Sequence, residues 1–133
     1  MNRISISDNK EKLNVPLIYN FLTNAYWAKG RTLDKVYRSI NNSMCFGVYQ
    51  DEHQIGFARV VTDKTIFAYL MDVFILETYR KRGYAGQLIQ AIHNHEELRD
   101  IPKWYLKTKD AHQFYYGLGY ELIEDGHKWM IKK

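Results

Sequence analysis

The chain has a single cysteine, Cys45, so it cannot form an internal disulfide, and nothing favours an oxidising compartment. Its apolar runs are all too short to cross a bilayer, which excludes a membrane-spanning helix. The first ten residues lack the apolar segment of a signal peptide, and the expected location is therefore cytoplasmic. Repeats, low-complexity tracts and linkers are also missing, so we expect one domain, residues 1–133.

What the sequence does contain is typical of a folded protein. The hydrophobic fraction is 46% and the aromatic fraction is 15%, and both argue against disorder. The formal net charge is +4. Such mild basicity suits a polyanionic small molecule but does not by itself indicate a nucleic acid or a membrane surface as partner.

One stretch, residues 69–93, organises the rest of the chain. Residues 69–76 are almost wholly apolar, with the β-branched and aromatic side chains of a buried strand. From Ala85 onward, apolar residues recur at i, i+3, i+4 and i+7, which predicts a helix. Residues 80–86 lie between these elements and form a basic turn that contains two glycines.

A strand followed by a glycine-containing turn and a helix N-terminus favours anion binding. The first N–H groups of a helix have no intrahelical partner, and the helix dipole places partial positive charge beside them. Gly83 and Gly86 leave space for a phosphate that a Cβ would obstruct, and the consecutive cations Arg80, Lys81 and Arg82 add positive charge. We therefore expect this turn to bind a cofactor that carries a pyrophosphate.

Two motifs connect the chain to a known family. The pattern Arg80-x-x-Gly83-x-Ala85 resembles the Q/R-x-x-G-x-G/A signature of the GNAT-superfamily N-acetyltransferases, which bind acetyl-coenzyme A. Residues 111–120, AHQFYYGLGY, resemble the family's A-x-x-F-Y-x-x-x-G-F segment. Two separated motifs in the correct order make the resemblance specific. It implies the GNAT fold, a mixed α/β domain around a central mixed sheet.

Periodicity and turn residues predict the element order β-α-α-β-β-β-α-β-α-β-β, which is also that of the GNAT fold. Asn14, Thr32 and Asp110 are the expected helix caps. Ile18, Phe21, Leu22 and Ala25 form the expected buried stripe of the first helix, and Leu33, Val36, Tyr37 and Ile40 that of the second. The strands are expected at residues 3–7, 44–49, 54–62, 69–76, 103–107, 120–123 and 127–131, with a hairpin turn at Asp125-Gly126.

The resemblance implies that main-chain groups hold the cofactor. A bulge in the central strand would separate it from its parallel neighbour, and the backbone of Val73, Phe74 and Ile75 would bind the pantetheine arm and polarise the thioester carbonyl. For their side chains we favour simple core packing. Main-chain N–H groups of Lys81, Arg82, Gly83, Tyr84, Ala85 and Gly86 would wrap the pyrophosphate. Lys81 or Arg82 would reach the 3′-phosphate, or else remain solvated surface charge.

The resemblance also implies a general acid. Tyr115 takes the place of the tyrosine that protonates the departing coenzyme A thiolate. Packing on an apolar helix face is the alternative, and Phe114 fills that role equally well. Thr108 stands where many relatives carry an asparagine that contacts the cofactor, and threonine lacks the amide, so this contact is left open.

Asp72 is the candidate base for the attacking amine, because an acid inside an apolar strand is costly unless it is paired or solvated in a cleft. The alternative is a structural ion pair with Arg59. Tyr26, Trp27 and Arg59 would line the acceptor pocket, with aromatic packing as the equal alternative for the first two. We expect no metal site, because His93 and His95 point to different helix faces, and Cys45 is expected to be a small core residue.

The sequence therefore predicts an acetyl-CoA-dependent N-acetyltransferase in which a primary amine attacks the thioester directly within a ternary complex. One alternative is a coenzyme A-binding protein of the same fold without turnover, and another is a small basic nucleic-acid-binding domain. The expected acceptor is a small-molecule or peptide amine of unknown identity, and neither a nucleic acid nor a membrane is an expected partner. A homodimer is left open.

Overall fold

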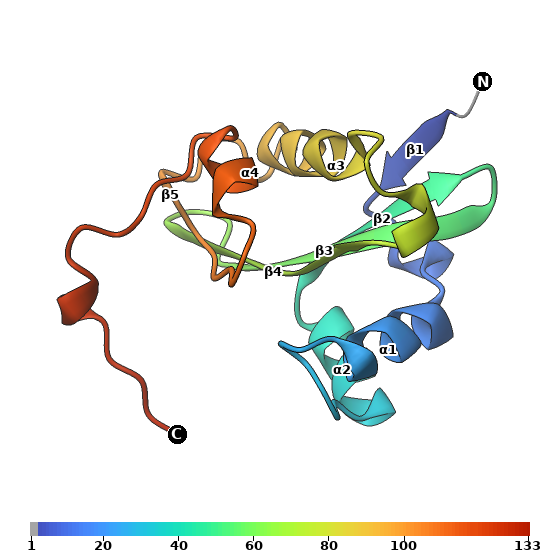
Figure 1. The fold of residues 1–133 in the computed structure, drawn as a ribbon, viewed down its shortest axis with the longest axis horizontal. Helices are drawn as coiled ribbons and strands as arrows, with labels where there is room; N and C mark the ends of the chain where they lie inside the picture. Colours follow the sequence, from blue (N-terminus) through green and yellow to red (C-terminus); the bar gives the residue numbers. More distant parts are fainter. Residues whose placement is uncertain (1–2) are drawn as a thin grey trace.

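Five strands form one sheet in the order β1-β2-β3-β4-β5 in the computed structural model, which describes residues 3–133 (Figure 1). The strands are β1 (Ile4–Ser7), β2 (Met44–Gln50), β3 (His53–Thr62), β4 (Phe67–Ile75) and β5 (Lys103–Tyr105). Neighbours from β1 to β4 are antiparallel, whereas β4 and β5 are parallel. This mixed sheet confirms the predicted fold class.

Helices cover both faces of the sheet. Figure 1 shows α1 (Val15–Asn24) and α2 (Leu33–Asn41) on one face, and α3 (Tyr84–His93) and α4 (His112–Tyr116) on the other. The short 3₁₀ turns are η1 (Lys10–Lys12), η2 (Glu77–Tyr79) and η3 (Gly126–Lys128). Among the described residues, no helix combines the length and apolar character needed to span a membrane.

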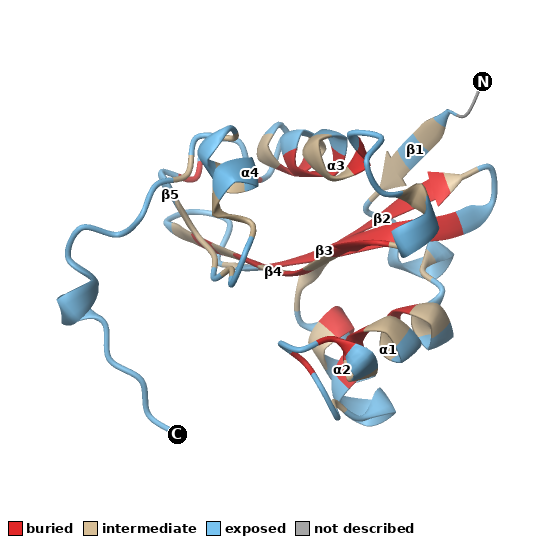
Figure 2. Cartoon of the chain, viewed as in Figure 1, coloured by how far each residue is buried: buried red, intermediate tan, exposed pale blue. Residues whose placement is uncertain are grey.

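A separate apolar cluster lies on each face of the sheet. Figure 2 shows the buried residues of the strands and helices in red. Beneath α3, the side chains of Leu88, Ile89 and Ile92 are completely buried, as the periodicity predicts. Full burial of each such side chain contributes about 1.5–3 kcal/mol to stability. On the opposite face, Ile18 and Leu22 of α1 pack with residues of α2, β3 and β4. The α1 and α3 stripes thus fix both helices against the strands that hold the site.

The first two helix caps are confirmed. The side chain of Asn14 accepts a hydrogen bond from Leu17 N at 3.1 Å, and that of Thr32 accepts one from Lys35 N at 3.3 Å. The third cap was wrongly placed at Asp110, because Thr108 Oγ1 accepts from the N–H of Ala111, the residue that precedes α4. The residue at the N-cap position of α4 is Ala111, and no side chain caps the helix.

The buried stripe of α2 is narrower than predicted. Val36 and Ile40 are buried, but the side chains of Leu33 and Tyr37 are 44% and 46% exposed. The buried pair lies at i and i+4, which is a single row along the helix. The helix therefore rests on the sheet through that row, and its other apolar residues face outward.

The two predicted C-terminal strands are wrong. Within the described residues, β5 is the last strand, and it ends at Tyr105 rather than at 107. A two-residue hairpin turn needs positive φ at its first central residue, but Asp125 has φ −107° and leads into the 3₁₀ turn η3. An isolated hairpin is only marginally stable without a sheet to pair with. Tyr120 still packs on His93 and Tyr115, and the chain beyond it is exposed and runs away from the helices and the sheet (Figure 1).

β4 contains the bulge that the family resemblance implies. Phe57 and Arg59 of β3 pair with Phe74 and Met71 of β4, so one residue on β3 faces two on β4. Asp72, inside this bulge, has a left-handed backbone with φ 57°. Aspartate tolerates this conformation better than most residues do. The irregularity lies where β4 leaves its parallel neighbour, and it positions the site described next.

Candidate active site

β4 and β5 separate beside the bulge. Their parallel pairing is restricted to Phe67↔Lys103, Ala68↔Trp104 and Tyr69↔Tyr105, whereas β4 continues to Ile75. A cavity of about 370 Å³ opens there. It is lined by Tyr26, Trp27, Arg31, Tyr69, Leu70, Met71, Asp72, Val73, Leu106, Lys107, Thr108, Asp110, Ala111 and Tyr115. The predicted splaying of the two strands is thus confirmed.

Six of the predicted site residues meet in this cavity: Tyr26, Trp27, Asp72, Val73, Thr108 and Tyr115. The turn residues 81–86 do not line it, and neither do Phe74, Ile75 and Arg59. The side chains of Phe74 and Ile75 are buried in the two apolar clusters, as expected for core residues. Arg59 is buried and contacts Asp72. Any contact of Phe74 and Ile75 with a bound molecule would therefore involve their backbone.

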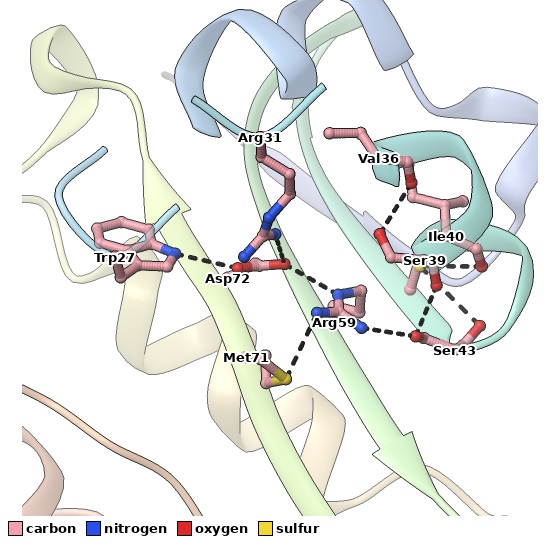
Figure 3. Close-up of polar contacts among 10 residues, drawn as sticks. Trp27, Arg31, Val36, Ser39, Ile40, Ser43, Arg59, Met71 and Asp72 are labelled. Atoms are coloured by element: carbon pink, nitrogen blue, oxygen red, sulfur yellow. Dashed lines mark hydrogen bonds and ion pairs between the residues drawn. The ribbon is translucent and has the colours of Figure 1, made fainter. Parts of the chain in front are cut away.

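Asp72 is the centre of a buried hydrogen-bond network (Figure 3). Its carboxylate accepts from Trp27 Nε1 at 3.0 Å, from Arg31 Nη1 at 2.8 Å and from Arg59 Nε at 2.9 Å. The Asp72 side chain is completely buried. The ion pair with Arg59 is therefore confirmed, while a role for Asp72 as base stays a prediction.

Arg31 is the residue of this network that sequence reasoning missed. It lies between the loop glycine Gly30 and the helix cap Thr32, a position without any local pattern of function. Its side chain is 19% exposed and reaches Asp72 across 41 positions of sequence. The sequence contains one indirect signal. Burial of the Asp72 carboxylate in an apolar strand costs free energy, and that cost calls for polar partners from elsewhere in the chain.

Each of the three guanidinium nitrogens of Arg59 makes a polar contact. Besides Asp72, it contacts Ser43 Oγ through Nη1 at 3.0 Å and Met71 Sδ through Nη2 at 3.4 Å. These contacts join β3, β4 and the residue that precedes β2 (Figure 3). The arrangement holds the left-handed residue Asp72 in place, and it therefore stabilises the bulge.

Tyr115 of α4 lines the cavity and also packs against the apolar cluster beneath α3. Burial raises the pKa of Tyr115 to about 12, with a smaller contribution from nearby Tyr26. The phenol is therefore protonated at neutral pH and can donate a proton or a hydrogen bond. The adjacent Tyr116 is 42% exposed and does not line this cavity, which agrees with the predicted register of the helix. Phe114 is 36% exposed, so the expectation that it is an equal core residue is wrong.

Tyr26 connects two loops at the cavity. Its hydroxyl accepts from the backbone N–H of Lys109 at 3.4 Å, and the Lys109 ammonium lies 5.3 Å from the ring centroid. The ring also makes an edge-to-face contact with Trp27 at 5.2 Å. Cation–π and aromatic contacts of this kind are each worth about 0.5–1.5 kcal/mol. They hold the α1–α2 loop against the loop that precedes α4.

The basic turn precedes α3 with the geometry of an anion site. Gly83 is the residue before the helix, with a left-handed backbone at φ 79°, and no side chain caps the first turn. An added Cβ would meet nothing within 4 Å at either Gly83 or Gly86, so the surrounding space is open. Arg80 Nε donates to Ile75 O at 2.9 Å and so ties the turn to the end of β4. The residues present therefore fit a bound pyrophosphate.

Some side chains of the turn before α3 are exposed to solvent, and one is buried in the core. Lys81, Arg82 and Gly83 are exposed, whereas Tyr84 is buried in the cluster beneath α3. The Arg82 guanidinium lies 5.6 Å from the ring centroid of Tyr79. Tyr84 can therefore serve a bound anion only through its main-chain N–H.

His93, His95 and Cys45 lie outside the cavity. His93 is hydrogen-bonded to Tyr120 Oη at 2.8 Å, and burial lowers its pKa. His95 contacts Asp8 at 2.8 Å, so the two histidines have different partners. Cys45 is a core residue, as predicted, and burial raises its pKa to about 11.

Comparisons with known proteins agree on one family. The model of the family described as acetyltransferase (GNAT) domain matches residues 41–122. A protein of Gibberella zeae that carries the provisional name of an acetyltransferase is 27% identical over 116 residues. That match covers 71% of this chain, and the chain spans only 64% of the relative's length.

Solved structures are similar over most of the chain. A GNAT-family protein of Xanthomonas campestris pv. campestris has a TM-score of 0.96 and 36% identity, over 100% of this chain and 94% of its own. An Elizabethkingia anophelis GNAT-family acetyltransferase with acetyl-CoA bound has a TM-score of 0.66 and 14% identity. The latter match covers 90% of this chain and 74% of the other, and it shows similarity of fold alone.

Proposed function

Because the chain belongs to the GNAT acetyltransferase family, we propose that it transfers an acetyl group from acetyl-CoA to a primary amine, by direct attack within a ternary complex. The observation that carries the proposal is the opening between β4 and β5 at the Asp72 bulge, opposite Tyr115. Holding two reactants together in such an opening accounts for much of the acceleration in reactions of this type.

Main-chain groups from two places would hold acetyl-CoA, which supplies an activated acetyl group as its thioester. The N–H groups of residues 81–86 would bind the pyrophosphate at the start of α3, supported by the charges of Lys81 and Arg82. The backbone of β4 from Val73 onward, which does not pair with β5, would bind the pantetheine arm and donate a hydrogen bond to the reacting carbonyl. Thr108 Oγ1 accepts from Ala111 N, and its hydroxyl proton and second lone pair would be available to the cofactor.

Tyr115 would donate its proton to the departing thiolate. A thiol with a pKa of about 8.5 is a good leaving group, so protonation assists less than it does in amide cleavage. General acid–base catalysis is worth ~10²–10⁴-fold, and we expect Tyr115→Phe to lower kcat by about a hundredfold, at the low end. Because the ring is retained, KM for acetyl-CoA and the melting temperature should change little. Steady-state rates at a saturating acceptor concentration test this.

Tyr116→Phe is the matched control, because it removes the same hydroxyl one position along the helix, where the side chain is exposed. It should behave like the parent protein. Because the pKa of Tyr115 is raised to about 12, its phenol stays protonated at moderately alkaline pH. Ionisation of Tyr115 should therefore not lower kcat of the parent protein in that pH range. A crippled Tyr116→Phe beside an unaffected Tyr115→Phe would contradict the assignment of the acid.

Asp72 has a positioning role in this proposal. Three donors occupy its carboxylate, and such a group is poorly placed to take a proton from an amine as well. We infer that Asp72 fixes the bulge, and that water in the cavity receives the amine proton. The alternative, in which Asp72 is the base, makes a different prediction for Asp72→Asn, and the Discussion compares the two.

The acceptor would enter past Tyr26 and Trp27, whose side chains are 57% and 40% exposed beside the cavity. Small-molecule amines and peptide amines both remain candidates, because fold and cofactor site do not specify the acceptor. Release of free thiol from acetyl-CoA, measured with a panel of such amines, tests the activity. The rival coenzyme A-binding protein predicts cofactor binding with no thiol release from any amine, whereas a nucleic-acid-binding domain predicts steep salt-dependent binding to DNA or RNA.

A further inference from the structure

Arg31 brings an excess positive charge to the cavity beside the bulge. Its Nη1 donates to Asp72 Oδ2 at 2.8 Å, and Arg59 Nε donates to the same oxygen at 2.9 Å (Figure 3). Two guanidinium groups thus share one carboxylate, which leaves this cluster with a net charge of +1. The side chains of Asp72 and Arg59 are 0% and 10% exposed, so solvent ions screen the cluster only weakly.

The excess charge lies on the cavity side of the cluster. Arg31 lines the cavity and its side chain is 19% exposed, whereas Arg59 does not line it. Among residues 3–133, the guanidinium of Arg31 has no hydrogen-bond partner besides Asp72. The buried side-chain atoms without a partner in this part of the chain are Tyr49 Oη and Gln50 Nε2. The Nε and Nη2 atoms of Arg31 are therefore accessible to water or to a bound molecule.

These two nitrogens suit a carboxylate. A planar guanidinium holds adjacent N–H groups in a fixed fork, and the two oxygens of a carboxylate accept from such a pair in parallel. A dianionic phosphate would exceed the single uncompensated charge of the cluster. The other charged residues that line the cavity are Lys107 and Asp110, which are exposed and opposite in sign. A monoanionic carboxylate is therefore the ligand group that this arrangement favours.

The α1–α2 loop holds Arg31 in place before any ligand binds. Gly30 N donates to Thr23 O at 3.0 Å, and Arg31 N donates to Ala28 O at 2.9 Å. The Asp72 carboxylate fixes the far end of the same side chain. Because the cation is already ordered, binding a carboxylate costs little further side-chain entropy.

We propose that the acceptor amine itself carries a carboxylate and that Arg31 binds it, so that the substrate class is an amino acid or a similarly small amino carboxylate. This inference rests on the acetyl transfer proposed above. Asp72 contacts the Arg31 guanidinium and directly precedes Val73 in β4. The carboxylate site and the backbone expected to polarise the thioester are therefore neighbours. A peptide, in which further residues separate the N-terminal amine from the C-terminal carboxylate, fits this spacing less well.

The carboxylate takes no part in the bond changes of the transfer. The amine nitrogen forms a bond to the acetyl carbon, the thioester C–S bond breaks, one amine proton passes to water in the cavity, and Tyr115 protonates the thiolate. Arg31 only binds and orients the acceptor. An acceptor with a neutral amine and one carboxylate carries a charge of −1, which matches the +1 of the cluster.

Pairs of acceptors that differ only in the carboxylate test the proposal. Rates with acetyl-CoA are measured for α- and β-amino acids and for their carboxamides. The parent protein should prefer the acid at least about tenfold in kcat/KM. This preference opposes intrinsic reactivity, because a nearby carboxylate makes the amine more basic and leaves less of it unprotonated. Equal rates for acid and amide, or faster amides, would overturn the proposal.

Arg31→Gln should lower the acid-to-amide ratio of kcat/KM at least about tenfold, mainly by raising KM for the acid. Both rates are taken on one preparation, so a partial loss of folded protein does not alter the ratio. Lys107→Gln is the matched control, because it removes a cation from the exposed rim of the same cavity, and it should keep the parent's ratio. An unchanged ratio in Arg31→Gln, or an equal loss in Lys107→Gln, would contradict Arg31 as the partner of the carboxylate.

Equilibrium binding separates this inference from the acetyl transfer. Calorimetry on the parent chain in the presence of coenzyme A, which has no acetyl group to give, measures the affinity for an amino acid and for its amide without turnover. The acid should bind at least about tenfold more tightly. Such a preference without any acetylated product would support the carboxylate site and contradict the transferase. Acetylation of amides as fast as acids, with equal affinities, would support the transferase and overturn the carboxylate site.

Discussion

Gly83→Val should abolish acetyl-CoA binding, with a loss of at least about a hundredfold in affinity. Gly83 adopts φ 79° immediately before α3, and a β-branched residue at positive φ is a strained outlier. The turn would have to change its backbone to accept valine, and the N–H groups of residues 84–86 would no longer converge on one anion. Titration calorimetry with acetyl-CoA measures the loss directly.

Gly30→Val is the matched control. Gly30 has the same φ of 79°, and an added Cβ there also meets nothing within 4 Å, so the local strain should be similar. It lies in the α1–α2 loop, away from the turn before α3. This variant should lose comparable stability and keep its affinity for acetyl-CoA. A folded Gly83→Val protein that binds as tightly as the parent would remove the turn from the cofactor site.

Asp72→Asn should be the most destabilising single change in the cavity. Arg31 and Arg59 are 19% and 10% exposed, and both would lose their counter-charge, while the new amide N–H₂ would face other donors. Breaking a buried ion pair from one side costs about 3–5 kcal/mol, which lowers the melting temperature of a domain of this size by roughly 10–20 °C. Thermal unfolding followed by circular dichroism measures this change.

The alternative role of Asp72 makes the opposite prediction. If Asp72 were the base, Asp72→Asn would depress turnover most at low pH and leave the melting temperature nearly unchanged. Asp110→Asn is the matched control, because it removes the same charge from an exposed residue of the same cavity. Asp110→Asn should leave the melting temperature unaltered. Measurement of turnover and stability on both variants separates a positioning residue from a base.

Local features of this fold could be predicted because they depend on few neighbours in sequence. Asn14 and Thr32 cap their helices through contacts three residues away, and the stripe of α3 follows from periodicity alone. The turn at Gly83 could be located for the same reason, since a left-handed residue before a helix leaves a local signature. The opening between β4 and β5 came instead from the resemblance to a family.

Features that depend on distant partners could not be predicted. Arg31 reaches Asp72 through the packing of the α1–α2 loop on β4, which no local pattern encodes. The exposure of Leu33 and Tyr37 depends on how α2 rests on the sheet, and not on the sequence of the helix. The strand patterns at 120–123 and 127–131 were misleading because a strand requires a paired edge, and within the described residues β5 pairs with β4 alone.

The most direct test of acetyl transfer is the molar ratio of thiol released from acetyl-CoA to amine acetylated. The parent protein is incubated with acetyl-CoA and a responsive amine, free thiol is measured by its absorbance reaction, and acetylated amine is measured by mass spectrometry. We expect one acetylated amine for each thiol released, and Tyr115→Phe should reduce both rates together by about a hundredfold. Thiol release that does not depend on the amine, or tight acetyl-CoA binding with no acetylated amine from any acceptor, would contradict an N-acetyltransferase.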